Sequence, residues 1–326
     1  MIEVVALPAL ATVQDLGRHG HWTEGLGSAG VMDPLSHRIA NWLLGNADTD
    51  ATFEIPLTPG RFEFIEDTGF AIAGAACDAR LDGLALPRCF AGTALAGQVL
   101  EFGAMRDGAR VYLALPGGID VPEMLGSRST QLREGFGGFE GRVLKPGDRL
   151  QGRSAPGRLS RISVNLPPLR QDGEAEIRLR VIPSAETGQF TETALEGFYG
   201  KAYKVTPQSN RQGYRLEGPI LERWTEGELR SHGIAPGIIQ VPASGQPIIQ
   251  LADAATMGGY PKIGCVIDAD LWRVAQARLG DLIRFEPLTL AGMREAEEAF
   301  AAYLEETRQQ VATGRRLFQS WSRDVF

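Results

Sequence analysis

The chain has 326 residues, which is enough for two domains with separate cores. Its 40 glycines and 19 prolines, in a sequence with an ordinary 43% of apolar residues, favour many short strands and tight turns over long helices. The formal net charge of −7 leaves no basic stripe that could neutralise phosphates, and this argues against nucleic acid as a partner.

The N-terminal half has the pattern of a β-rich domain, which we place at residues 1–155. Residues 2–7 alternate as a strand does. Further strand-like runs, separated by Gly, Pro or Asp, lie at 62–65, 70–73, 99–102 and 111–115. This spacing is typical of a β-barrel or a β-sandwich. One helix is predicted to follow Asp33, with Pro34 at its first position, and to end near Gly45.

A G-x-G-x-x-G pattern is present at Gly25, Gly27 and Gly30, but it lacks the context of a dinucleotide site. No apolar strand precedes it, and no matched acidic residue closes a βαβ unit. We therefore predict no dinucleotide binding at these glycines.

Residues 156–175 belong to a segment rich in Arg, Ser and Pro and are predicted to be an inter-domain linker. The β pattern restarts in a second domain at residues 176–288, with strand-like runs at 177–181, 238–241 and 248–251.

Two weak matches between the halves predict an internal duplication. The pattern R-x-G-[ring]-x-x-E-G begins at Arg18 and again at Arg211. Pro56 corresponds to Pro242 at nearly the same separation. We therefore expect two β-rich halves of common ancestry.

The C-terminal segment, residues 289–326, is predicted to be an amphipathic helix to about residue 312, followed by a tail. Apolar residues recur on one helical face, with Glu and Arg between them. We expect this face to dock on the second barrel or on another subunit.

The stretch 231–264 has the highest density of turn residues and reactive side chains. His232 lies in a loop, where an imidazole can exchange protons near neutral pH. Lys262 follows Tyr260-Pro261 and could hold a carboxylate, a phosphate or a carbonyl oxygen. Asp253 could orient either residue. The catalytic candidates are therefore His232, Lys262 and Asp253, against the simpler alternatives of a turn-bonding His, an exposed Lys and a turn-capping Asp.

A second group of polar residues is predicted to bind substrate. Residues 208–211 place three neutral hydrogen-bonding side chains before the charged Arg211, which suits an amide or a carboxylate ligand. Alternatively, Arg18 and Arg211 could each brace its own barrel by donating hydrogen bonds to backbone carbonyl oxygens. Arg128, in a polar loop, is the better candidate for clamping an anion through two N–H groups. The substrate-binding candidates are Arg211, Asn210, Gln208, Arg128, Ser231 and Gln240.

Sequence blocks at 12–20, 115–130, 206–213, 231–242 and 258–264 share a family pattern that spans nearly the whole chain. They resemble the biotin-dependent carboxyltransferase family also called allophanate hydrolase subunit 2. Stand-alone members of that family resemble the C subunit of the bacterial ATP-dependent 5-oxoprolinase. The resemblance implies two cyclophilin-like β-barrel domains, so the expected fold is mainly β, with a few short helices and a C-terminal helix.

The same resemblance implies a function within a complex. Its members are expected to open the lactam ring of 5-oxoproline to L-glutamate, with ATP acting at the level of the complex. The partners would be the A subunit of that complex together with its carboxyltransferase-like B subunit, and the chain alone would be inactive. One alternative is a carboxyltransferase for urea, allophanate or a related amide, with carboxybiotin brought by a separate carrier. Another is a non-catalytic antagonist of a kinase inhibitor similar to the B subunit.

Several patterns are missing from the sequence. It has no Walker A motif, no H-E-x-x-H and no Cys/His cluster, so we predict no metal site. It has no Met-Lys-Met, so biotin is not expected on this chain. The scattered Cys77, Cys89 and Cys265, together with no basic N-terminal region and no long apolar run, predict a cytoplasmic protein without a membrane segment.

Overall fold

The computed structural model describes residues 1–321 except 8, 9, 58, 156–158, 160, 172, 226 and 228, and leaves out the side chains of 318–321. The chain forms two compact units. Unit 1 contains Met1–Arg18, Asp33–Pro167 and the chain from Ala302 onward, and unit 2 contains His19–Met32 and Pro168–Ala301. Part of the predicted linker (156–158, 160 and 172) and residues 322–326 of the predicted tail lie outside the described residues.

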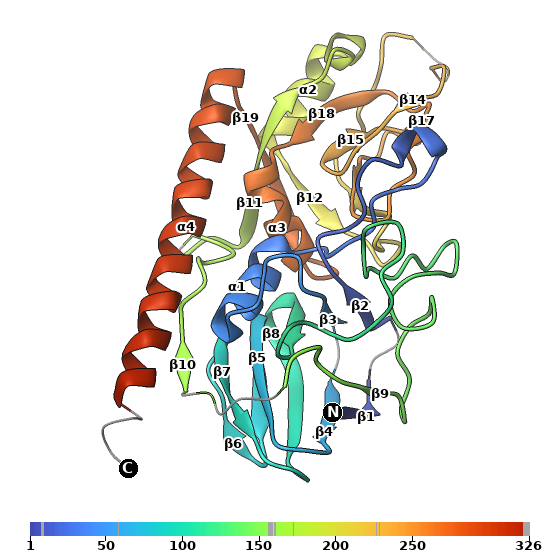
Figure 1. Ribbon diagram of the computed structural model, residues 1–326. Coiled ribbons are helices and arrows are strands. Elements are labelled where there is room, and N and C mark those ends of the chain that lie inside the picture. Colours follow the sequence, from blue (N-terminus) through green and yellow to red (C-terminus); the bar gives the residue numbers. More distant parts are fainter. Residues whose placement is uncertain are drawn as a thin grey trace. The chain divides into compact units, whose positions relative to one another are not determined.

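Unit 1 is built on a ten-stranded sheet (Figure 1). Its main path runs β10-β7-β5-β8-β4-β1-β9, and β2, β3 and β6 pair off this path. The strands are β1 (Ile2–Ala6), β2 (Thr12–Gln14), β3 (Thr52–Pro56), β4 (Gly60–Phe64), β5 (Thr68–Leu81), β6 (Leu84–Ala85), β7 (Phe90–Ala94), β8 (Val99–Ala114), β9 (Arg149–Leu150) and β10 (Ile162–Ser163). The long β8 pairs with β3, β4 and β5 and so joins the sheet together.

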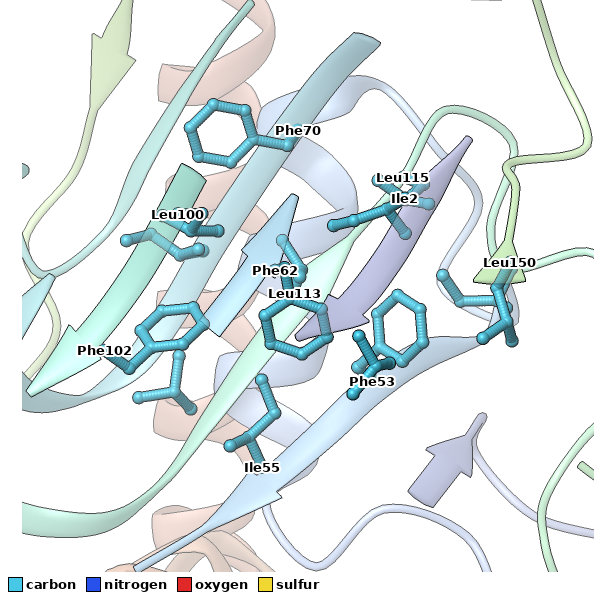
Figure 2. Close-up of a cluster of buried hydrophobic side chains, with 14 of the residues drawn as sticks. Ile2, Phe53, Ile55, Phe62, Phe70, Leu100, Phe102, Leu113, Leu115 and Leu150 are labelled. Atoms are coloured by element: carbon cyan, nitrogen blue, oxygen red, sulfur yellow. The ribbon is translucent and has the colours of Figure 1, made fainter. Parts of the chain in front are cut away.

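The core of unit 1 is a cluster of buried aromatic and aliphatic side chains from these strands (Figure 2). Phe62 contacts both Phe53 and Phe102, with ring centroids 5.6 Å and 6.1 Å apart respectively. All three are almost fully buried. Burying each such side chain stabilises the fold by roughly 1.5–3 kcal/mol, so this layer is a main source of the stability of unit 1.

Helix α1 (Pro34–Leu44) has the predicted ends. The side chain of Asp33 accepts a hydrogen bond from the backbone N–H of Ser36 at 3.0 Å, and Pro34 occupies the first turn. Gly45 ends the helix with φ 77°, and its N–H bonds back to the last turn. Most of the helix is buried against the sheet, as expected of a structural element.

Unit 2 contains a closed seven-stranded barrel in the order β11-β18-β15-β16-β13-β12-β19. Its strands are β11 (Glu176–Pro183), β12 (Ala202–Val205), β13 (Gly213–Glu217), β15 (Ile238–Gln240), β16 (Ile248–Gln250), β18 (Lys262–Val266) and β19 (Leu282–Pro287). A separate two-stranded ribbon joins β14 (His232–Gly233) to β17 (Met257–Gly258). The remaining elements are η1 (Trp22–Glu24), η2 (Thr187–Gln189), α2 (Glu192–Gly200) and α3 (Asp268–Gln276).

The long C-terminal helix α4 (Leu290–Trp321) extends beyond the predicted end near residue 312 (Figure 1). Within unit 1, Val311 is buried, and Gly314 faces Ile162 of β10 so closely that a Cβ would lie 2.8 Å from the Ile162 side chain. A side chain at position 314 would therefore require the end of the Ile162 side chain to move.

The predicted fold class is confirmed: the protein is mainly β, with few helices and a closed barrel. The two units are not consecutive halves of the sequence, because residues 19–32 belong to unit 2.

Candidate functional site

Glu186, His232 and Lys262 form a contacting cluster in unit 2. His232 is the first residue of β14, Lys262 is the first residue of β18, and Glu186 directly precedes η2. His232 Nε2 lies 2.8 Å from Glu186 Oε1. Lys262 Nζ contacts the same His232 Nε2 and lies 3.7 Å from the same carboxylate oxygen. The structure thus brings together two of the predicted catalytic residues, His232 and Lys262.

Two glycines allow the ribbon that carries His232 to pack closely. His232 pairs with Gly258 across the β14–β17 ribbon. A Cβ on Gly258 would lie 2.6 Å from Gln240 Nε2, and a Cβ on Gly259 would lie 2.7 Å from the carbonyl oxygen of Leu229. A methyl group at Gly259 would push the ribbon away from the backbone of Leu229, so this position requires glycine for space, whereas at Gly258 the end of the Gln240 side chain would have to move.

Glu186 is fixed by hydrogen bonds to the start of β18. The backbone N–H of Lys262 donates to Glu186 Oε2 at 2.7 Å. Ser184 Oγ donates to the carbonyl oxygen of Lys262, and Thr187 Oγ1 donates to that of Ile263 at 2.7 Å. These bonds place one carboxylate oxygen on the backbone and leave the other facing the His232 ring.

The hydrogen bonds of His232 define where a proton can reside. Its Nδ1 lies 2.9 Å from the carbonyl oxygen of Arg230, which can only accept, so Nδ1 carries a proton. Nε2 then faces both an accepting carboxylate of Glu186 and the amine of Lys262. The three groups therefore share protons at one position, which is suited to accepting or delivering a proton.

Lys262 is buried, with 6% of its surface exposed. Burial holds the pKa of its ammonium below the ordinary value, and the Glu186 carboxylate acts in the opposite direction. A buried amine beside a carboxylate can act as a compact donor to a developing negative charge.

Gln240 and Ser231, both predicted to bind substrate, lie next to the cluster. Gln240 is the cross-strand partner of Lys262, at a register shift between β15 and β18. Its Oε1 accepts a 3.0 Å hydrogen bond from Gln250 Nε2. Ser231 precedes His232 in the chain and is exposed.

Asp253 has a different partner from the one expected. Its carboxylate forms a two-point ion pair with Arg211, with distances of 2.9 Å from Nε to Oδ2 and from Nη2 to Oδ1. Among the described residues, no contact joins Asp253 to His232 or Lys262. The planar guanidinium matches both carboxylate oxygens, so Glu186, and not Asp253, is the carboxylate that orients His232.

Arg211 also donates to the carbonyl oxygen of Gly30 at 2.6 Å. In unit 1, Arg18 donates to the carbonyl oxygen of Ser129 at 2.7 Å. Both arginines thus bond carbonyl oxygens, as in the bracing alternative considered for this pair.

The other substrate-binding candidates have local partners. Asn210 Oδ1 accepts the backbone N–H of Gln212 at 2.8 Å and so shapes a turn, and the neighbouring Gln208 is exposed. Arg128 belongs to unit 1, where it pairs with Glu123 at 2.9 Å and donates to the carbonyl oxygen of Val121. The structure does not place these three side chains in the Glu186–His232–Lys262 cluster.

Glu186 was missed from the sequence. It lies in Pro-Ser-Ala-Glu-Thr, directly after a predicted strand that ends at Pro183. A carboxylate in the loop after a strand is a general signal for a site, but nothing in the sequence linked this one to residues 46 and 76 positions away.

Metal-binding clusters and membrane-spanning helices are both absent from the described part of the chain. No three His, Cys, Asp or Glu side chains gather there as a metal ion would require. No helix described combines the length and the apolarity needed to cross a membrane.

Comparisons with known proteins agree with one another. Residues 24–287 match the family described as the carboxyltransferase domain, subdomain A and B. The chain is 41% identical over 306 residues to the C subunit of 5-oxoprolinase from Escherichia coli (strain K12), covering 94% of this chain and 97% of that protein. It is 38% identical over 311 residues to the Haemophilus influenzae protein of the same name, covering 95% and 99%. Urea carboxylase of Kluyveromyces lactis, a solved structure, matches with a TM-score of 0.85 and 29% identity over 94% of this chain and 29% of that chain.

Proposed function

The chain belongs to the carboxyltransferase domain, subdomain A and B family, and we propose that it is the C subunit of an ATP-dependent 5-oxoprolinase. Such a complex opens the lactam ring of 5-oxoproline and releases L-glutamate. The main support is the extent of the match to the E. coli protein of that name, which covers nearly the full length of both chains. The urea carboxylase contains the matching region as less than a third of a longer chain.

The Glu186–His232–Lys262 cluster supports a role in the chemistry. A lactam carbonyl is a poor electrophile, so ring opening needs stabilisation of the negative charge that develops on its oxygen. We assign that stabilisation to the Lys262 ammonium, which is buried and close to the partly exposed His232. We assign proton transfer to His232 Nε2, with Glu186 as the residue that positions the ring.

Arg211 has another role in this proposal. The sequence suggested oxygen stabilisation by this residue, but Asp253 and the carbonyl of Gly30 hold its guanidinium. We therefore propose that Arg211 and Asp253 maintain the loop structure around the barrel. Lys262 then stabilises the lactam carbonyl oxygen of the substrate without help from Arg211.

We assign the remaining steps of the reaction to the assembled complex and not to this chain alone. At the cluster, the Lys262 ammonium already faces Glu186 and His232, so these residues do not form a phosphate-binding site. We propose that the A subunit of the complex and its carboxyltransferase-like B subunit complete the enzyme, and that the chain alone is inactive. The three cysteines are free thiols, which supports a cytoplasmic location.

A carboxyltransferase acting on urea or a related amide is the second candidate. The match to the K. lactis urea carboxylase favours it, and the same cluster could hold an amide carbonyl. The sequence has no Met-Lys-Met, so biotin would arrive on another chain. A third candidate, a non-catalytic antagonist of a kinase inhibitor similar to the B subunit, would leave the cluster unused.

Co-expression with the two proposed partner subunits tests the three candidates. The purified three-subunit mixture should release L-glutamate from 5-oxoproline only with ATP, and the single chain should not. His232→Ala should abolish this activity in the assembled mixture. Avidin-sensitive carboxylation of urea would instead establish the second candidate. A complex that assembles but never turns over 5-oxoproline would contradict the proposal.

A further inference from the structure

The strand pair β15–β18 contains a register shift at the position of Lys262. Ile239 of β15 lies opposite Gly264 of β18. The next residue, Gln240, lies opposite Lys262, so Ile263 has no partner residue in this strand pair. Because side chains alternate along a strand, a regular pair would place Ile263 opposite Gln240 and turn Lys262 to the other face. An extra residue of this kind is a β-bulge, which re-aims side chains. The direction of the Lys262 side chain therefore depends on the bulge.

The side chain of Gln240 is held by a second buried amide, that of Gln250 on the neighbouring strand β16. Gln250 Nε2 donates to Gln240 Oε1 at 3.0 Å. The two residues are only 4% and 8% exposed, and a buried amide is costly unless it is hydrogen-bonded. These two side chains, the amide pair, therefore fix each other on the barrel.

The carbonyl oxygen of Tyr260 determines which end of the Gln240 amide faces the bulge. This oxygen can only accept, and Gln240 Nε2 lies 3.5 Å from it. The amide group therefore turns its NH2 toward Tyr260 and its oxygen toward Gln250. Gly258 leaves space for this arrangement, because a Cβ there would lie 2.6 Å from Gln240 Nε2.

The segment that carries Lys262 is tied to its surroundings on two sides. On the β15 side, the backbone N–H of Val241 donates to the carbonyl oxygen of Pro261 at 2.8 Å. On the β11 side, Ser184 Oγ donates to the carbonyl oxygen of Lys262. To these bonds the amide pair adds a support made by side chains of the barrel strands.

We propose that Gln240 and Gln250 are positioning residues for Lys262. The amide pair holds the bulge in place and so keeps the Lys262 amine beside His232. In this assignment Gln240, which the sequence suggested as a substrate-binding residue, acts through Lys262 and touches no substrate. The effect on catalysis rests on the proposed function, but the placement of Lys262 can be measured in the chain alone.

Amine labelling of the full chain tests the placement of Lys262. The folded chain would be treated briefly with acetic anhydride, and mass spectrometry would compare acetylation at Lys262 with that at the exposed Lys201. Lys262 is 6% exposed, so it should react more slowly than Lys201. Gln240→Met should raise the ratio of the two rates by about tenfold, because the buried amide of Gln250 loses its acceptor and local opening becomes easier.

Gln246→Met is the matched control in the same barrel. The Gln246 amide also makes two hydrogen bonds, accepting from the N–H of Gly218 at 2.8 Å and donating to the carbonyl oxygen of Gly218 at 3.0 Å. In the described structure, no hydrogen bond joins Gln246 to residues 260–262. This variant should therefore change the labelling ratio by less than about twofold.

An equal rise in both variants would show a general loosening of the barrel and would overturn the assignment, as would an unchanged ratio in Gln240→Met. If Gln240→Met does not fold, Gln250→Asn decides the question, since it keeps an amide but shortens its reach to Gln240. A raised ratio in Gln250→Asn supports the positioning role, and an unchanged ratio contradicts it.

Kinetics of the assembled three-subunit mixture separate this inference from the proposed function. With 5-oxoproline and ATP, Gln240→Met should lower kcat by about tenfold and leave KM within about twofold, whereas a substrate-binding role would raise KM instead. A raised KM at unchanged kcat would overturn the positioning role. If the wild-type mixture releases no glutamate, the proposed function fails, and the labelling ratios alone decide whether the amide pair positions Lys262.

Discussion

Glu186 holds His232 through one carboxylate oxygen and the backbone of β18 through the other. The 2.8 Å contact from Oε1 to Nε2 fixes the ring, and the 2.7 Å bond to Oε2 ties the same side chain to the start of the strand that carries Lys262. The orientation of the imidazole therefore depends on a residue in the loop after β11 that is hydrogen-bonded to the barrel strand β18.

Glu186→Gln should lower kcat of the assembled enzyme by about tenfold to a thousandfold, because the ring loses its charged partner. The amide has the same shape, so the free energy of unfolding should change by little more than the contribution of a single hydrogen bond. Steady-state assays of glutamate release and urea unfolding would measure both. The exposed Glu196→Gln, in α2, is the control. Full activity in Glu186→Gln would rule out its positioning role.

Gly259→Ala should impair activity, because its Cβ would lie 2.7 Å from the backbone oxygen of Leu229, and that atom cannot rotate away. The resulting shift would displace the ribbon that holds His232. Gly233→Ala is the matched control on the same ribbon, since a Cβ there meets nothing within 4 Å. The two variants would be compared in the complex by kcat and KM. Equal kinetics would show that the ribbon tolerates displacement.

Asp253→Asn should destabilise unit 2 by roughly 3 kcal/mol, because it leaves the Arg211 guanidinium partly unpaired in a site where both side chains are 10% exposed. Urea unfolding would measure the loss. The activity per folded molecule should persist, since Asp253 contacts neither His232 nor Lys262 in the described structure. A variant of normal stability with a large loss of kcat would instead support the catalytic role expected from the sequence.

The stability of the wild type relative to Lys262→Met should increase at alkaline pH. Burial lowers the pKa of Lys262 in the folded protein from its ordinary 10.5. Between the folded-state pKa and 10.5, the unfolded chain therefore binds more protons, and raising the pH favours the folded state. Urea midpoints from about pH 7 to about pH 10 would test this, with the exposed Lys201→Met as the control. A difference that stays constant with pH would argue against the buried, destabilised charge.

Local signals predicted the local structure well. Asp33, Pro34 and Gly45 define a helix through capping, which needs only neighbouring residues, and α1 has these ends. The strand-like runs in 238–241 and 248–251 correspond to β15 and β16, because their apolar residues are bounded by turn residues.

Relationships between distant residues could not be predicted from such signals. The partner of Asp253 depends on which loop approaches it, and Arg211 fits its carboxylate better than His232 does. In sequence order, α2, β12 and β13 lie between Glu186 and His232, and no periodicity connects the two residues. The assignment of residues 19–32 to unit 2 likewise arises from tertiary contacts alone.

The pairing of β11 with β19 has a consequence for assembly. These strands are the first and last of the barrel in sequence, and their parallel pairing from Glu176↔Leu282 to Val181↔Pro287 completes the circle. A closed circle presents no unpaired backbone to a strand from another chain. Any protein that recognises the barrel must therefore do so through its loops and side chains, and the barrel itself is protected from edge-to-edge aggregation.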